Sequence, residues 1–134
     1  MSDCLFCKII KKEIPANVVY EDDLVLCFLD INPSNPGHVL VAPKKHAQDL
    51  FDVTTQDLTA VMNVVPIVAK KVLKAVDAEA FNLHVNHGEI AGQVIPHLHF
   101  HIIPRFQDDG LQLFKGKPAS PNELNDLAAK IKSA

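Results

Sequence analysis

Hydrophobic and polar residues alternate strictly in one short stretch of the chain, IPHLHFHIIPR at residues 95–105. His97, His99 and His101 occupy every second position, with apolar residues between them. In a β-strand, alternate side chains share one face, whereas a helix would scatter the three imidazoles around its axis. The pattern predicts a strand over residues 97–103, with an apolar face that can be buried and a face of imidazoles.

Other stretches have strand-like patterning or helical spacing. Four more strands are expected at residues 17–22, 23–31, 38–43 and 80–88. Helices are expected at residues 54–76 and 121–132, where apolar side chains recur at helical spacing. Strands in two groups around one long helix predict an α+β domain with a mostly antiparallel, five-stranded sheet.

The long helix has a clear start and one irregularity. Thr54 can cap its first turn together with Asp57, three positions later. Pro66 falls inside the helix and lacks the N–H that would bond the Met62 carbonyl. We therefore expect one helix that bends near Val65.

Size and charge limit the classes of function. The 134 residues contain no repeat or long linker, so a single domain over residues 1–134 is expected. A net charge of −3 disfavours broad adhesion to nucleic acid or membranes. The N-terminal sequence is too charged for a secretion signal, and no apolar run reaches the roughly 20 residues of a membrane span. A soluble, cytoplasmic protein is expected.

Two chemistries suit a face of histidines. Alternate imidazoles can chelate a catalytic metal with water in an open position. Alternatively, one imidazole can act as a nucleophile while its neighbours handle protons. The spacing does not separate these two, and a single histidine of this kind would more simply be a polar residue on a half-exposed strand.

The cysteines indicate a metal site rather than a disulfide. Cys4 and Cys7 have C-x-x-C spacing, and an odd total of three makes a poor disulfide framework. Two thiolates with two imidazoles would form a closed, tetrahedral zinc site. The alternative is that both are small apolar residues, as Cys27 is expected to be within its strand.

The stretch HLHFHII resembles the His-x-His-x-His-x-x motif of the histidine triad family of nucleotide hydrolases and transferases. The likeness extends upstream to CLFCKIIKKEIPANVVYEDD and FLDINPSNPGHVLVAPKKH, and includes NHGEIAGQ before the motif. The resemblance implies an antiparallel sheet with helices. It also implies a homodimer formed through the long helix and the strand at residues 80–87.

By this resemblance His99 is the nucleophile that attacks the α-phosphorus of a nucleotide, with His101 and His38 as further active-site histidines. The matching phosphate-contacting residues are Asn86 and Gln93, and Gly92 is expected to let the backbone come close to the substrate. One departure concerns Val94, because many relatives have Ser or Thr there and valine has no hydroxyl to donate.

A nucleoside pocket is expected around the second strand. Phe28 and Asp30 share one face by strand spacing, which suits a base on the ring and ribose hydroxyls on the carboxylate. From the residues alone, most of the apolar residues of this pocket would more simply be core, and Asp30 could equally be a turn residue. The resemblance adds further wall residues: Leu5, Phe6, Ile9, Ile14 and Ile31.

Zinc-bearing relatives complete the cysteine pair with two histidines. These correspond to His46, which ends PKKH, and to His97. The resemblance thus implies a structural zinc ion held by Cys4, Cys7, His46 and His97, and no organic cofactor.

The function expected from the resemblance is hydrolysis of purine nucleoside 5′-phosphoramidates or related conjugates through a covalent nucleotidyl-histidine. HIIPR partly resembles the branch that cleaves dinucleoside polyphosphates, which is one alternative. A metallohydrolase with catalytic zinc and a nucleotide-binding regulatory protein with incidental hydrolysis are the others.

Overall fold

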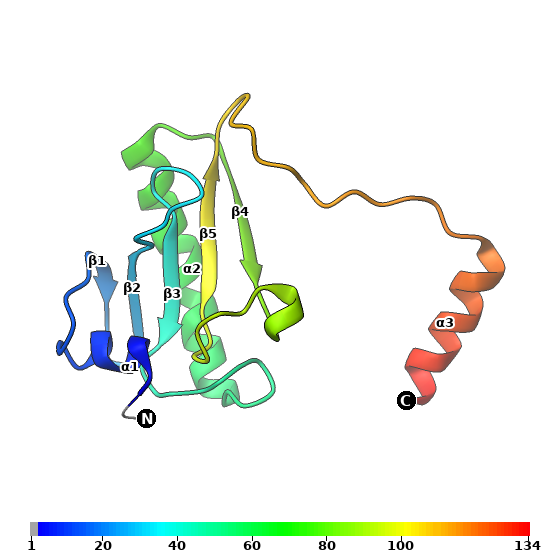
Figure 1. The fold of residues 1–134 in the computed structure, drawn as a ribbon, viewed down its shortest axis with the longest axis horizontal. Coiled ribbons are helices and arrows are strands. Elements are labelled where there is room, and N and C mark those ends of the chain that lie inside the picture. Colours follow the sequence, from blue (N-terminus) through cyan, green and yellow to red (C-terminus); the bar gives the residue numbers. More distant parts are fainter. Residues whose placement is uncertain (1–2) are drawn as a thin grey trace.

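A five-stranded antiparallel sheet forms the centre of the molecule in the computed structural model, which describes residues 3–134 (Figure 1). The order across the sheet is β1-β2-β3-β5-β4. The expected α+β class and antiparallel sheet are confirmed. The strands span Val18–Glu21 (β1), Val25–Leu29 (β2), Val39–Pro43 (β3), Ala80–Val85 (β4) and Phe100–Arg105 (β5).

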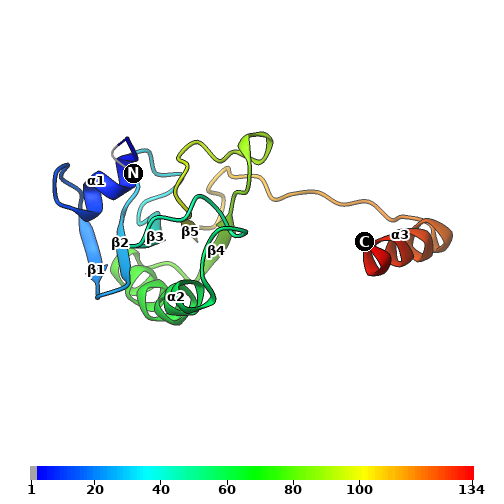
Figure 2. The same cartoon turned by 90° about the horizontal axis from the view of Figure 1, so that it is seen from below.

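One long helix, α2 (Thr55–Val76), covers one face of the sheet (Figure 2). Thr54 caps it as expected, since its hydroxyl oxygen accepts the Asp57 N–H at 3.1 Å. Pro66 lies inside this continuous helix. The bend at Val65 stays a prediction.

The two faces of the sheet bury different sets of side chains. Toward α2 the core is mostly aliphatic, with one aromatic ring: β2, β3 and β5 contribute Val25, Cys27, Val39, Val41, Phe100 and Ile102. A short helix, α1 (Leu5–Ile10), lies on the opposite face, where Phe6, Cys7 and Ile9 pack with Phe28 and Leu40 (Figure 2). The sequence analysis assigned no element to α1.

The histidine strand begins later than its pattern predicted. The ladder of β5 starts at Phe100, so His97 and His99 precede it. The cause is a pair of tertiary contacts. The side chain of His97 contacts the Pro43 carbonyl, with 2.8 Å from Nε2 to O, and the Leu98 N–H bonds the Ala47 carbonyl. Leu98 still joins the core on the α2 side.

The C-terminal residues form an arm rather than part of the packed body. After β5 the chain runs out to α3 (Pro121–Ser133), which projects away from the sheet (Figure 1). The helix is the expected one, yet none of its residues is buried, and Leu124, Leu127 and Ile131 are exposed. A single domain over residues 1–134 stays a prediction.

None of the helices among residues 3–134 combines the length and apolar character that crossing a membrane requires.

Candidate functional site

A single cross-strand row on the α1 side of the sheet carries the main functional side chains. In register, Phe28 of β2 lies opposite Leu40 of β3, Leu40 lies opposite His101 of β5, and His101 lies opposite His84 of β4. Residues opposite one another share a face. The row therefore leads from an aromatic ring at one end to two imidazoles at the other.

A cavity of about 410 Å³ opens over this row. Its walls are predominantly apolar, and its polar groups come from Asp30, Asn32, His99 and His101. All the wall residues expected from the resemblance line it: Leu5, Phe6, Ile9, Ile14 and Ile31. Concave, mostly apolar sites with a few polar groups are typical of small-ligand binding.

His99 is held in one orientation by two contacts. Its Nδ1 lies 2.7 Å from the carbonyl oxygen of His97, and because a carbonyl only accepts, Nδ1 carries the proton. The ring of Phe6 lies edge-on against it, with 4.9 Å between the centroids. In the neutral ring, Nε2 is left with a free lone pair, as a nucleophile requires.

The tautomers of His38 and His101 follow from a similar chain of bonds. The backbone N–H of Ser34 donates to Nδ1 of His38 at 3.0 Å, so the proton of the neutral ring is on Nε2. That Nε2 lies 2.8 Å from Nδ1 of His101 and donates to it. His101 therefore carries its own proton on Nε2, where it can donate to a ligand.

Burial keeps these imidazoles neutral. It lowers the pKa of His101 to about 3, with the neighbouring imidazoles of His99, His84 and His38 acting in the same direction. Burial also lowers the pKa of His99 and of His38, although the Asp30 carboxylate opposes the shift in both. Neutral imidazoles at neutral pH provide both a lone pair and N–H donors.

Asp30 lines the cavity just after β2. Its Oδ1 accepts the Asn32 N–H at 2.8 Å, and its Oδ2 lies 3.6 Å from Nε2 of His38. The carboxylate thus lines the cavity and lies close to His38. The turn role and the ligand role considered for Asp30 are compatible, because each uses a different oxygen.

The residues expected around the phosphate, Asn86, Gly92 and Gln93, have different surroundings. Gly92 lines the cavity with φ of +98°, a conformation that favours glycine, and the Asn86 side chain lies beside its backbone. The amide of Gln93 is already engaged: it accepts from Gly88 N and donates to the carbonyls of Gln48 and Ile95. Phosphate contact by these residues stays a prediction.

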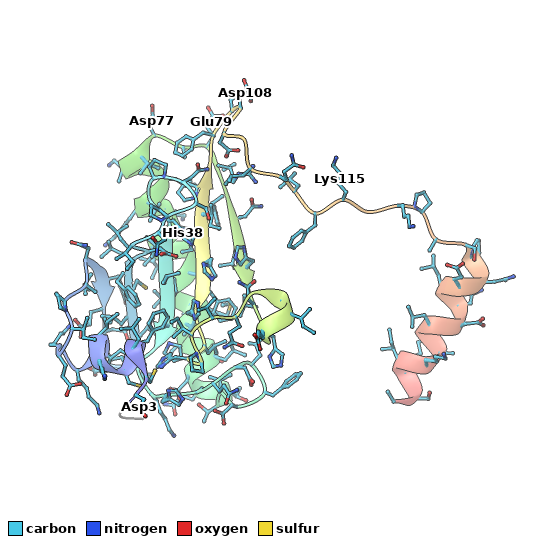
Figure 3. The ribbon with its side chains drawn as sticks, in the orientation of Figure 1. Asp3, His38, Asp77, Glu79, Asp108 and Lys115 are labelled. Carbon is cyan, nitrogen blue, oxygen red and sulfur yellow. The ribbon has the colours of Figure 1, made fainter. Side chains whose placement is uncertain are left out.

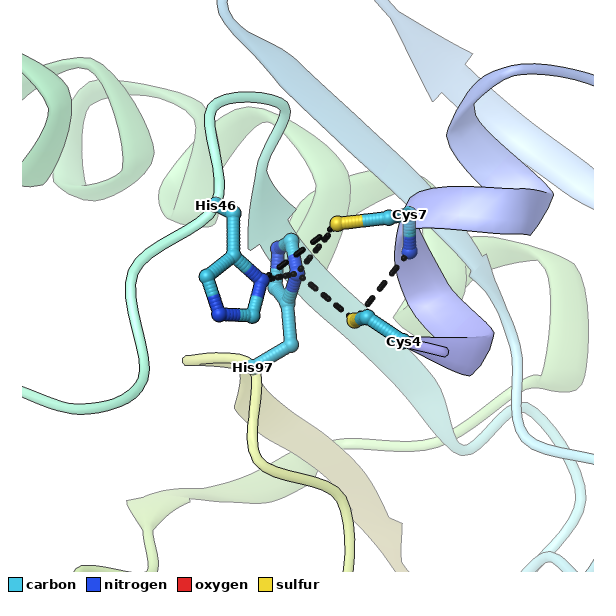
Figure 4. Close-up of side chains that lie close together, drawn as sticks. All are labelled: Cys4, Cys7, His46 and His97. Atoms are coloured by element: carbon cyan, nitrogen blue, oxygen red, sulfur yellow. Dashed lines mark hydrogen bonds between the residues drawn. The ribbon is translucent and has the colours of Figure 1, made fainter. Parts of the chain in front are cut away.

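Cys4, Cys7, His46 and His97 form one cluster at the edge of the cavity-bearing face (Figure 4). The cysteine sulfurs and the Nδ1 atoms of the histidines all lie within 4.8 Å of one another. Closest are His46 to His97 at 3.2 Å, Cys7 to His46 at 3.3 Å and Cys4 to His97 at 3.4 Å. Segments 93 residues apart in sequence thus meet at one point.

These four residues fit a zinc ion. Ligands about 2.0–2.3 Å from a tetrahedral metal are separated from one another by roughly 3.3–3.8 Å. Four of the six pairs of ligand atoms lie 3.2–3.6 Å apart, close to that range. The Nε2–H of His97 donates to the Pro43 carbonyl, which leaves Nδ1 free to coordinate. Burial raises the pKa of Cys7 and lowers that of His97 to about 4. With four protein ligands, no position stays open for a substrate.

Three residues near the site were not assigned a role from the sequence. The His84 ring lies 4.5 Å from that of His101 and 32° from parallel, as its cross-strand partner. Asn35 and Asp109 bond each other beside the loop that precedes His38. The alternation of residues 80–85 could have indicated His84, but no local pattern relates Asn35 to Asp109.

Comparisons with known proteins agree with this geometry. The HIT domain family model matches residues 11–108. The adenosine 5′-monophosphoramidase of Schizosaccharomyces pombe is 41% identical over 132 residues, which are 97% of this chain and 96% of that protein. An adenylylsulfatase of Arabidopsis thaliana is 46% identical over 110 residues, or 82% of this chain, and the match spans 56% of the plant protein.

Among solved structures, a Streptococcus mutans protein superposes with a TM-score of 0.94 at 37% identity. The match covers 99% of this chain and 85% of that one. The similarity therefore includes the arm as well as the sheet.

Proposed function

Because this chain belongs to the HIT domain family, we propose that it is a nucleotide hydrolase that cleaves at the α-phosphorus of purine nucleoside 5′-phosphoramidates or related nucleotidyl conjugates. The names of the yeast monophosphoramidase and the plant adenylylsulfatase support this substrate class. The observation that carries the proposal is the tautomer of His99, which leaves Nε2 unprotonated in a cavity shared with Phe28 and Asp30.

In the proposed first step, Nε2 of His99 attacks the α-phosphorus and the bond to the leaving group breaks. The leaving amine, alcohol or phosphate takes the bonding electron pair and a proton from the site. His101 donates its Nε2–H toward the phosphoryl oxygens, where negative charge increases. The product is a nucleoside monophosphoryl group covalently bound to His99.

In the second step, water attacks the same phosphorus and the bond to Nε2 of His99 breaks. The nucleoside monophosphate leaves, and the water supplies the proton that replaces the one taken by the leaving group. Two displacements with a good imidazole leaving group replace one slow attack by water.

The nucleoside half of the substrate would occupy the apolar end of the cavity. The base would lie against Phe28, whose ring is fixed edge-on by Phe6 at 5.2 Å between centroids. The ribose hydroxyls would donate to Asp30. Both residues line the same cavity as His99, so one molecule can contact all three.

A structural zinc ion would be held by Cys4, Cys7, His46 and His97. Bound there, it would supply a crosslink between the N-terminal segment and the strand that follows His97. We also propose a homodimer through α2 and β4. Supporting this, β4 is an edge strand with Phe81 and Leu83 partly exposed at 36% and 41%.

The experiment that tests the substrate class compares kcat/KM on an adenosine 5′-phosphoramidate and on a diadenosine polyphosphate. The proposal predicts a higher value for the phosphoramidate. A preference for the polyphosphate would assign the chain to that alternative. Equally slow turnover of both would favour a nucleotide-binding protein with incidental hydrolysis.

A further inference from the structure

Asp109 is the most heavily bonded carboxylate among the described residues, although it lies outside the cavity. Arg105 donates to it through Nε at 2.8 Å and Nη2 at 2.9 Å, and the backbone N–H groups of Phe106 and Leu111 donate as well. A fifth bond comes from the side-chain amide of Asn35 at 2.9 Å. Its side chain is only 6% exposed.

Asn35 connects this carboxylate to the loop before β3. Its Nδ2 also donates to the Pro104 carbonyl at 2.9 Å, so both protons of the amide are used. Its own backbone carbonyl accepts the N–H of His38 at 3.1 Å. The side chain is therefore fixed to β5 and the following turn, while its backbone holds His38.

The same loop determines which ring nitrogen of His38 carries the proton. Ser34, one residue before Asn35, donates its backbone N–H to Nδ1 of His38, and this bond directs the Nε2–H of His38 to His101. If residues 34–35 moved, the Ser34 N–H would no longer donate to Nδ1 of His38. The His38 ring could then adopt the other tautomer, with its proton on Nδ1. In that tautomer, Nε2 of His38 could no longer donate to His101.

We propose that Asp109 and Asn35 are positioning residues that hold His38 in its Nε2–H tautomer and thereby orient His101 toward the substrate. Arg105 keeps Asp109 in place through its bidentate hydrogen bonding to the carboxylate. A carboxylate 74 residues away from Asn35 in sequence thus controls a proton in the site. The link to turnover rests on the proposed function, whereas the link to the tautomer does not.

The alternative is that this network only stabilises the base of the arm. Two carboxylates at neighbouring positions offer a matched pair of variants. Asp109→Asn removes the charge and weakens the bonds to Arg105 and Asn35. Asp108→Asn removes one equal charge from an exposed side chain, labelled in Figure 3 at the end of the body where the arm begins.

The direct readout is the tautomer of His38, measured by long-range proton–nitrogen NMR of the full chain. We expect a single Nε2–H form in the parent and in Asp108→Asn. In Asp109→Asn and in Asn35→Ala, a mixture of both tautomers is expected. Asn35→Ala provides a second route if Asp109→Asn fails to fold.

The second readout is the split between kcat and KM on a nucleoside phosphoramidate. Asp109→Asn and Asn35→Ala should each lower kcat by about 10-fold, because an active-site group is misplaced, and leave KM within about 2-fold. The double variant should be no slower than the slower single variant, since both act through one chain of bonds.

If the tautomer of His38 is unchanged in both Asp109→Asn and Asn35→Ala, the proposal is overturned, whatever the activity. An equal loss of kcat in Asp108→Asn also overturns it, since that loss would reflect removal of a negative charge rather than loss of the hydrogen bond between Asp109 and Asn35. If the chain hydrolyses no nucleotide, the NMR result still decides whether His38 is held in this way.

Discussion

The ring of Phe6 lies 4.9 Å from the ring of His99, at an angle of 75°. Phe6 is on α1 between Cys4 and Cys7, so the segment that contributes two sulfurs to the candidate metal cluster also supports the proposed nucleophile. The structure thereby relates the candidate metal cluster to the cavity through this aromatic contact and through the His97 carbonyl, which accepts from Nδ1 of His99. Metal loss should therefore act on the site indirectly, through the position of α1.

Replacing Cys4 or Cys7 by Ala should remove a bound metal, lower the melting temperature and raise KM more than it lowers kcat. The reason is that α1 carries Phe6 into the nucleoside end of the cavity. Cys27→Ala is the matched control, because it removes a buried thiol outside the cluster. Metal content by mass spectrometry, thermal unfolding and steady-state kinetics measure these effects.

Chelation distinguishes a structural from a catalytic ion. We expect activity to be lost slowly and together with structure. Immediate loss of turnover in a chain that stays folded, restored by added metal, would instead indicate a metallohydrolase.

Asp30→Ala should raise KM for a nucleoside phosphoramidate by about 10-fold, the order expected for losing a hydrogen bond to a charged group. The effect should depend on the ribose. The parent should discriminate between the ribonucleoside and its 2′,3′-dideoxy analogue, whereas Asp30→Ala should treat them alike. Equal discrimination in both proteins would mean that Asp30 does not contact the sugar.

Acid should destabilise the fold through the buried imidazoles. The pKa of His101 is about 3 in the folded chain against an ordinary 6.5, so the unfolded chain binds more protons between these values. The free energy of unfolding should therefore decrease as the pH falls from about 6.5 toward 3. Melting temperatures between about pH 7 and pH 4 should show a shallower decrease in His101→Asn than in the parent; equal slopes would contradict this assignment.

Leu83→Lys should convert the proposed dimer into a monomer, because it introduces a charge at the free edge formed by β4. Val19→Lys is the matched control: Val19 lies on the other edge strand, β1, and has the same 41% exposure as Leu83. Light scattering coupled to gel filtration measures both masses. Dissociation by Val19→Lys alone would place the interface at β1 instead.

Local patterns in the sequence predicted the features that depend on one element at a time. Strand spacing predicted that Phe28 and Asp30 share a face, and both line the cavity. The Thr54 cap correctly marked the start of α2. The start of β5 was predicted too early, because the side chain of His97 contacts a backbone carbonyl of β3. That contact depends on tertiary structure, so the alternation could not reveal it.

Contacts between residues far apart in the chain could not be predicted from local sequence patterns. The bond from Asn35 to Asp109 joins a loop to a turn across the end of the sheet, and neither residue belongs to a repeating pattern. Contact of Gln93 with phosphate stays a prediction, and the sequence did not indicate that its amide bonds three backbone groups. Side-chain direction in such loops is fixed by the packed neighbours rather than by periodicity.

Intact-mass spectrometry of the protein quenched during turnover tests the nucleophilic role of His99 most directly. The parent, and a His87→Ala variant altered at an exposed histidine, should gain the mass of one nucleotidyl group, while His99→Ala should gain nothing and lose turnover. Turnover by His99→Ala at the parental rate, or an adduct that persists in that variant, would contradict the account.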